Sequence, residues 1–172
     1  MDKKVLFTTR AAVTAALYAL LTLLGAVFNL SYGAVQFRFA EVLCILPVFT
    51  AAAVPGLTVG CFIANILSPV SPLDTVFGTL ATFFAAVCSR ALKNVKVHSL
   101  PFCSLLMPVI FNGLIIGAET AFFVSAESFA AAFAVNSLTV ALGETAVMLI
   151  LGSILYFTVE RNERLKRIIS GK

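Results

Sequence analysis

Residues 101–124, PFCSLLMPVIFNGLIIGAETAFFV, contain a single charged side chain and determine the fold class of the chain. A helix that crosses a bilayer needs about 20 mostly apolar residues, so this stretch predicts a membrane-spanning helix. The whole sequence agrees, since 60% of its 172 residues are hydrophobic and 12% are charged. Soluble domains have about 25% charged residues. The sequence therefore predicts an integral membrane protein and excludes a water-soluble domain, a disordered chain and a nucleic-acid-binding protein.

Five more apolar stretches flank this segment. The first, residues 5–28, is too long for the core of a signal peptide, and the two that follow are short, so we expect them to be tilted or partly broken. The six predicted spans are residues 5–28, 36–50, 55–68, 74–90, 101–124 and 133–158. Because no internal repeat or second domain is visible, residues 1–172 are predicted to form one all-α transmembrane domain.

Basic residues are concentrated in three clusters, at residues 3–10, 90–96 and 161–172, which hold 11 of the 12 Lys and Arg side chains. Cytoplasmic segments close to membrane spans are enriched in Lys and Arg. If all three clusters are cytoplasmic, an even number of helices separates each from the next. Six spans satisfy this condition, so we expect a multi-pass protein of the cytoplasmic membrane with both termini in the cytoplasm.

Eight polar or charged side chains lie within the predicted spans or at their ends. A charged side chain that faces lipid at mid-bilayer costs roughly 2.5–3.5 kcal/mol, so these groups should face a polar interior. The predicted helix directions place them nearer the extracytoplasmic side. We therefore expect a substrate-binding cavity that opens to that side, lined by Gln36, Arg38, Glu41, Asn65, Asp74, Asn112, Glu119 and Glu144.

Several of these residues have structural alternatives. Arg38 and Glu41, three residues apart, can form a salt bridge that only joins helices. Asp74 can serve as the N-cap of its helix, and the two asparagines can form hydrogen bonds between helices. Glu119 and Glu144 have no obvious basic partner, which favours a role in binding.

The sequence contains no recognisable catalytic or metal-binding motif. Cys44, Cys61, Cys88 and Cys103 lie in apolar runs without metal-ligand spacing, so we interpret them as reduced packing residues. His98 is the single histidine and lies in a basic loop. The ATP-binding pattern G-x-x-x-x-G-K-[ST] is absent. We therefore expect no enzyme activity, metal or cofactor in this chain, and energy from partner subunits or an ion gradient.

Small residues recur at a spacing that permits close helix approach. Ala11, Ala15 and Ala19 form one stripe of the first helix, beside Ala12 and Ala16. This stripe can either pack internally or dock a partner subunit. Two glycine pairs are predicted to pack helices internally: Gly56 with Gly60, and Gly113 with Gly117.

Several segments resemble the QueT family over about residues 10–160. The most specific is residues 33–43, GAVQFRFAEVL, and the resemblance continues at residues 74–86, DTVFGTLATFFAA, and at residues 108–119, PVIFNGLIIGAE. It implies the substrate-binding S component of an energy-coupling factor (ECF) transporter, a six-helix bundle that captures queuine or a related 7-deazaguanine. A departure at Thr50-Ala51, where the family has Thr-Pro, affects a turn.

The resemblance also implies partners: a transmembrane coupling subunit, which the stripe of Ala11, Ala15 and Ala19 would contact, and two cytoplasmic ATPases that use ATP. A 7-deazaguanine edge presents two hydrogen-bond donors, which suit one carboxylate acceptor, and we expect Glu119 and Glu144 to be the principal acceptors. Two alternatives remain. One is an S component for another vitamin-like compound, of riboflavin or thiamine type, and the other is an autonomous proton-coupled secondary transporter.

Overall fold

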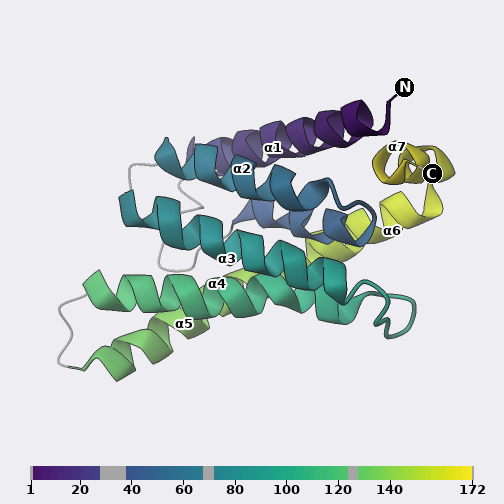
Figure 1. Cartoon of the computed structure of the whole chain (residues 1–172). Helices are drawn as coiled ribbons and strands as arrows, with labels where there is room; N and C mark the ends of the chain where they lie inside the picture. The colour runs from purple at the N-terminus through teal and green to yellow at the C-terminus, as the bar shows by residue number, and fades with distance from the viewer. Residues whose placement is uncertain (1, 28–37, 68–71, 124–127, 172) are drawn as a thin grey trace.

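The chain is a bundle of helices, and the computed structural model describes residues 2–27, 38–67, 72–123 and 128–171 (Figure 1). No strand occurs among these residues, which confirms the predicted all-α class. The helices are α1 (Lys3–Val27), η1 (Phe39–Val48), α2 (Ala53–Ile66), α3 (Pro72–Ala91), α4 (Phe102–Phe123), α5 (Phe129–Ala146), η2 (Val147–Gly152), α6 (Ser153–Arg161) and α7 (Glu163–Ser170).

Four of the described helical segments are long and apolar enough to cross a membrane. They are α1, α3, α4 and the continuous segment Phe129–Arg161, which contains α5, η2 and α6. Large apolar side chains on their outer surfaces are exposed, such as Leu24 at 47% and Phe122 at 76%. Such an extensive apolar exterior is unsuited to water. The chain is therefore a multi-pass membrane protein.

The segment predicted as a membrane helix over residues 36–50 differs from an ordinary α-helix. It is a 3₁₀-helix over Phe39–Val48, with Pro47 inside it, and Gln36 lies outside the described residues. A 3₁₀-helix rises about 2.0 Å per residue, so ten residues extend about 20 Å instead of the roughly 15 Å of an α-helix.

Two other predicted boundaries need correction. The last long helix begins at Phe129 and ends at Arg161, instead of running over residues 133–158, and it contains a π-helical turn at Val147–Gly152. The helix α3 begins at Pro72, a residue favoured in the first turn, so Asp74 lies inside that turn and is not the N-cap.

Both glycine pairs pack helices together, as predicted. A Cβ atom on Gly56 or Gly60 would lie 2.6 Å or 2.7 Å from a backbone carbonyl oxygen of α1. A Cβ on Gly113 would lie 3.3 Å from Ala141, and one on Gly117 would collide with Ser137. Because these glycines have no side chains, α1 can pack closely against α2, and α4 against α5.

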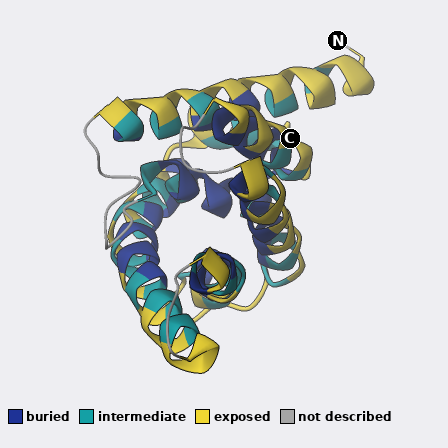
Figure 2. Cartoon of the chain, turned by 90° about the vertical axis from the view of Figure 1, so that its left-hand side faces the viewer, coloured by how far each residue is buried: buried dark blue, intermediate teal, exposed yellow. Residues whose placement is uncertain are grey.

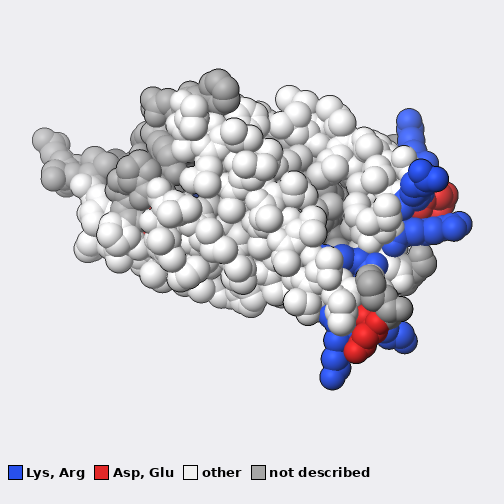
Figure 3. All heavy atoms as spheres, turned by 90° about the horizontal axis from the view of Figure 1, so that it is seen from above, with Lys and Arg blue, Asp and Glu red and all other residues white. Residues whose placement is uncertain are grey.

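The two ends of the bundle differ in charge. Both termini lie at one end (Figure 1), and the described Lys and Arg side chains visible from above gather at that same end (Figure 3). Seen from the opposite end, the buried residues face the interior and the exposed residues face outward (Figure 2). We refer to the end that carries the termini as the basic end, and to the other as the far end.

Candidate functional site

Glu41 lies at the centre of a buried polar cluster and is fully enclosed by the protein. Its Oε1 accepts hydrogen bonds from Tyr18 Oη at 2.5 Å and from Thr82 Oγ1 at 3.1 Å. Its Oε2 accepts from Cys44 Sγ at 2.9 Å, and Arg38 Nε lies 3.9 Å from Oε1. Because a carboxylate has about four acceptor positions, these neighbours occupy most of its capacity. Glu41 therefore organises the surrounding helices.

A second group of polar side chains converges on Gly78 of α3. A Cβ atom built on Gly78 would lie 2.7 Å from Asn65 Nδ2, 2.9 Å from Asp74 Oδ1 and 3.5 Å from Arg38 Nη2. Asn65 Nδ2 also donates to the carbonyl oxygen of Asp74 at 3.0 Å. Glycine at this position leaves the space that these side chains occupy. The end of α2, the start of α3 and the start of η1 thus meet at the far end of the bundle.

Asn112 and Glu144 form a buried pair between α4 and α5. Asn112 Nδ2 donates to Glu144 Oε1 at 3.1 Å, and both side chains are fully buried. Asn112 Oδ1 and Glu144 Oε2 have no hydrogen-bond partner among the described residues. A buried acceptor without a partner costs about 1–3 kcal/mol, so the arrangement favours a ligand that supplies the missing donors. The π-helical turn that begins at Val147 follows directly, and such turns are frequent at functional sites.

Glu119 is a third acceptor that the described residues leave unsatisfied. It lies near the far end of α4, seven residues after Asn112 and on the same face of the helix. Its side chain is buried, and Oε2 has no partner within the described ranges. Asn112 and Glu119 therefore place two buried polar side chains on one face of α4.

The interior as a whole is rich in hydrogen-bond acceptors. It contains four carboxylates and one guanidinium among the described residues, and the acceptors without partners are concentrated on α4 and α5. This composition suits a neutral or cationic ligand that carries several N–H donors. It suits a phosphate or a dicarboxylate poorly, because such ligands would add negative charge beside buried carboxylates.

Sequence reasoning missed the partners that surround Glu41. Tyr18, Cys44 and Thr82 carry no charge, so composition alone does not distinguish them from packing residues. A usable signal existed for two of them. Cys44 is three residues from Glu41, which is one turn of a 3₁₀-helix, and Thr82 is eight residues from Asp74 on the same face of α3.

The alanine stripe of α1 faces the protein interior. Ala11 and Ala15 are the residues closest to Gly56 and Gly60 of α2, and Ala15 is 7% exposed. Ala19 is half-buried. Two members of this stripe therefore contact α2, and docking of a partner subunit by Ala11, Ala15 and Ala19 stays a prediction. The alanines that α1 leaves exposed are those of the neighbouring stripe, Ala12 and Ala16.

Comparison with known proteins identifies the family. The sequence model described as QueT transporter matches residues 8–161. The chain is 38% identical over 71 residues to the queuosine precursor transporter QueT of Lactococcus lactis subsp. cremoris (strain MG1363), and this alignment covers 41% of each protein. No solved structure matches the chain. Because the family match spans most of the sequence, the chain belongs to the QueT transporter family.

Proposed function

We propose that this chain is the substrate-binding S subunit of an ECF-type importer, and that it captures queuine or a related 7-deazaguanine at the extracytoplasmic face. The observation that carries the proposal is the buried pair of Asn112 and Glu144. This pair has two acceptor atoms without partners among the described residues. Membership of the QueT transporter family supports a queuosine precursor as the substrate.

The chemistry of the ligand matches the acceptors on α4 and α5. The edge of a 7-deazaguanine presents a ring N–H and an exocyclic amine, and one carboxylate can accept both. Glu144 is our choice for this contact, because its Oε2 is buried and Asn112 already fixes its Oε1. Glu119 can accept from the aminomethyl group that some precursors carry, and Arg38 can donate to the carbonyl oxygen of the base.

Extracytoplasmic capture is supported by the polarity of the bundle. The candidate site extends from Asn112 and Glu144, at the middle of their helices, to Asp74 and Glu119 near the far end. The basic end carries the clusters that the positive-inside rule assigns to the cytoplasm (Figure 3). We propose six spans with both termini in the cytoplasm. In this arrangement the two short apolar segments, η1 and α2, span the membrane together with the four long ones.

We further propose that a transmembrane coupling subunit and two ATPases power the uptake, since the sequence has no ATP-binding loop of its own. The exposed face of α1 that carries Ala12 and Ala16 is the proposed docking face. Small residues allow a partner helix to approach closely, and these two alanines are exposed, whereas Ala11 and Ala15 contact α2.

The test is equilibrium binding of queuine to the purified full chain, with Glu144→Gln and Glu119→Gln variants. We expect each variant to weaken binding by about tenfold or more, since a hydrogen bond to a charged group contributes about 1.5–3 kcal/mol. The matched control is Glu160→Gln, which removes a carboxylate at the basic end. Normal binding of queuine by both site variants would refute the assignment.

A proton-coupled secondary transporter is the second candidate, and one observation favours it. Glu144 is a buried carboxylate with an oxygen that lacks a partner among the described residues, and buried carboxylates in membranes can relay protons. Reconstitution in liposomes distinguishes the two proposals. Uptake of queuine by this chain alone, driven by a proton gradient, would favour the second candidate. Uptake that requires the coupling subunit and ATP would favour the first.

A further inference from the structure

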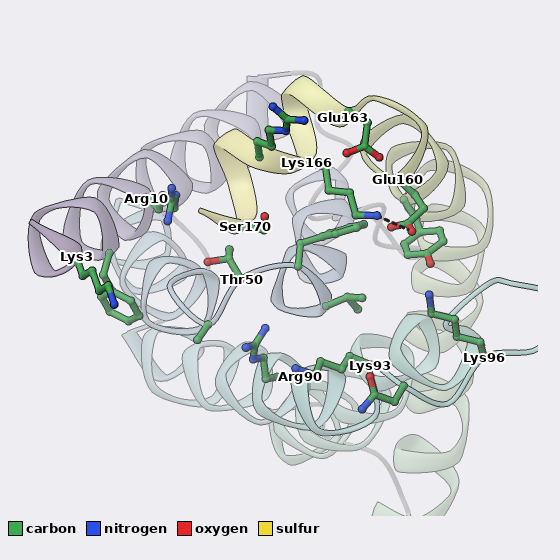
Figure 4. Close-up of a pocket in the computed structure, with 17 residues that line it drawn as sticks. Lys3, Arg10, Thr50, Arg90, Lys93, Lys96, Glu160, Glu163, Lys166 and Ser170 are labelled. Atoms are coloured by element: carbon green, nitrogen blue, oxygen red, sulfur yellow. Dashed lines mark hydrogen bonds and ion pairs between the residues drawn. The ribbon is translucent and has the colours of Figure 1, made fainter. Parts of the chain in front are cut away.

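A cavity of about 830 Å³ lies at the basic end of the bundle. Its walls come from the start of α1, the link between η1 and α2, the end of α3 with the loop that follows, the end of α6, and α7 (Figure 4). Seven basic and two acidic side chains of the described residues line it. Its charge is therefore opposite in sign to that of the acceptor-rich interior at the far end.

Two of the arginines that line this cavity are fixed by the protein. Arg90 Nη1 donates to the carbonyl oxygen of Pro47 at 2.8 Å, and Arg10 Nε donates to that of Ile168 at 2.8 Å. Each bond joins segments that are far apart in the sequence. A guanidinium has five N–H donors, so each arginine keeps further donors while its position in the cavity wall is held.

The positive charge of the cavity is largely uncompensated. Lys166 pairs with Glu160 at 2.9 Å. This bond raises the pKa of Lys166, so the lysine stays charged. Lys93, Lys96 and Lys3 line the same cavity and form no ion pair with a carboxylate of the described residues. Concentrated like charges repel each other, so an anion bound among them would be stabilised.

Membrane orientation alone does not require this arrangement. The positive-inside rule requires only that Lys and Arg lie on the cytoplasmic side. Lys4, Arg161 and Arg164 meet that requirement at the same end of the molecule without lining the cavity. The basic residues of the cavity come from α1, α3, α7 and the loop after α3, and they line one hollow (Figure 4).

We propose that this cavity binds a phosphate-bearing anion at the cytoplasmic membrane surface, either the headgroup of an anionic phospholipid or a free phosphate compound. Arginine binds phosphate through two parallel N–H donors, and lysine adds a compact charge. Basic pockets between helices at this level of a membrane bind anionic headgroups. The rings of Phe49 and Tyr156 stack in the wall of this cavity, with centroids 5.4 Å apart.

The test uses the purified full chain in a neutral detergent and measures lipid adducts by native mass spectrometry. The probes are phosphatidylglycerol, phosphatidylcholine and inorganic phosphate. The cavity variant is Lys93→Gln/Lys96→Gln, and the matched control, Lys4→Gln/Arg164→Gln, removes two positive charges outside the cavity. We expect the cavity variant alone to lose affinity for phosphatidylglycerol, by about tenfold. Thermal unfolding checks that both variants are folded, and Arg167→Gln provides a second cavity variant.

The probes distinguish the two sources of phosphate. If phosphatidylglycerol binding depends on the cavity and exceeds that of phosphatidylcholine, the ligand is a lipid headgroup. If only inorganic phosphate shows cavity-dependent binding, the ligand is a free phosphate compound. The proposal would be overturned if the cavity variant and the matched control lost equal affinity. It would also be overturned if the wild-type chain showed no preference for phosphatidylglycerol or phosphate.

Discussion

The far end and the basic end of this bundle place charge in opposite ways. At the far end, carboxylates are buried, and one of them, Glu41, accepts hydrogen bonds from three neighbouring side chains. At the basic end, the carboxylate of Glu160 pairs with Lys166, and both side chains are about one third exposed, at 34% and 35%. Burial makes each far-end group dependent on its partners, because a buried charge without them is costly. An ion pair near water contributes little to stability, because water solvates both charges.

The largest difference between the two ends should be one of stability. Glu41→Ala leaves the donors of Tyr18 and Thr82, and the charge of Arg38, without their acceptor. Breaking a buried charged pair costs about 3–5 kcal/mol, and we expect a loss of that size in reversible unfolding of the detergent-solubilised chain. Glu160→Ala at the basic end should leave stability within experimental error. A similar loss of stability in Glu41→Ala and Glu160→Ala would contradict the proposed difference between buried and partly exposed carboxylates.

The second prediction separates two buried carboxylates, Glu41 and Glu144. Glu144→Gln should reduce queuine affinity by about tenfold or more, yet leave the stability of the ligand-free chain unchanged or increased. A neutral amide is cheaper to bury than a carboxylate with an unsatisfied oxygen, and the amide retains an acceptor for Asn112. Ligand-free unfolding measured beside queuine titration tests both parts. A large loss of stability would show that Glu144 is structural, like Glu41.

A smaller effect is expected at Gly78, where Arg38, Asn65 and Asp74 converge. Gly78→Ala places a methyl group 2.7 Å from Asn65 Nδ2 and 2.9 Å from Asp74 Oδ1. We expect a loss of about 1 kcal/mol, at the lower end for overpacking, because both contacts are side-chain atoms that can move. The control is Gly113→Ala, with its nearest contact at 3.3 Å. If Gly78→Ala were as stable as Gly113→Ala, the side chains around Gly78 would be packed less tightly than these distances indicate.

The smallest effect concerns pH at the basic end. The hydrogen bond to Glu160 raises the pKa of Lys166 above its ordinary 10.5. The stabilisation is therefore fully present below that ordinary value and is lost as pH rises through the raised pKa. We expect Glu160→Gln to lower stability slightly at neutral pH and to abolish the decline in strongly alkaline solution, so that the two proteins become equally stable there. A large loss of stability at neutral pH would indicate a stronger role for this pair.

Much of the architecture could be predicted from apolar length and charge clusters, because both are set by the bilayer rather than by particular contacts. The helical conformation of residues 39–48 could not. An α-helix and a 3₁₀-helix share the same apolar composition over so short a run, and Pro47 alone does not select between them.

Within the site, sequence indicated which side chains are costly in a membrane but not how they are paired. Glu41 and Glu144 look equivalent in the sequence, yet the first is surrounded by donors and the second has an unsatisfied oxygen. The difference depends on how each helix is rotated about its axis. The same uncertainty affected α1, where the stripes of Ala11 and Ala12 are adjacent and equally small, and only packing against Gly56 distinguishes them.

Equilibrium binding to the purified full chain, without ATP or partner subunits, is the most direct test of the proposed function. The ligands are queuine, its aminomethyl precursor, guanine and riboflavin. We predict tight one-to-one binding of a 7-deazaguanine, with little binding of riboflavin. Binding of riboflavin or another vitamin in place of any 7-deazaguanine would contradict the substrate, and binding of none of these compounds would contradict the role in substrate capture.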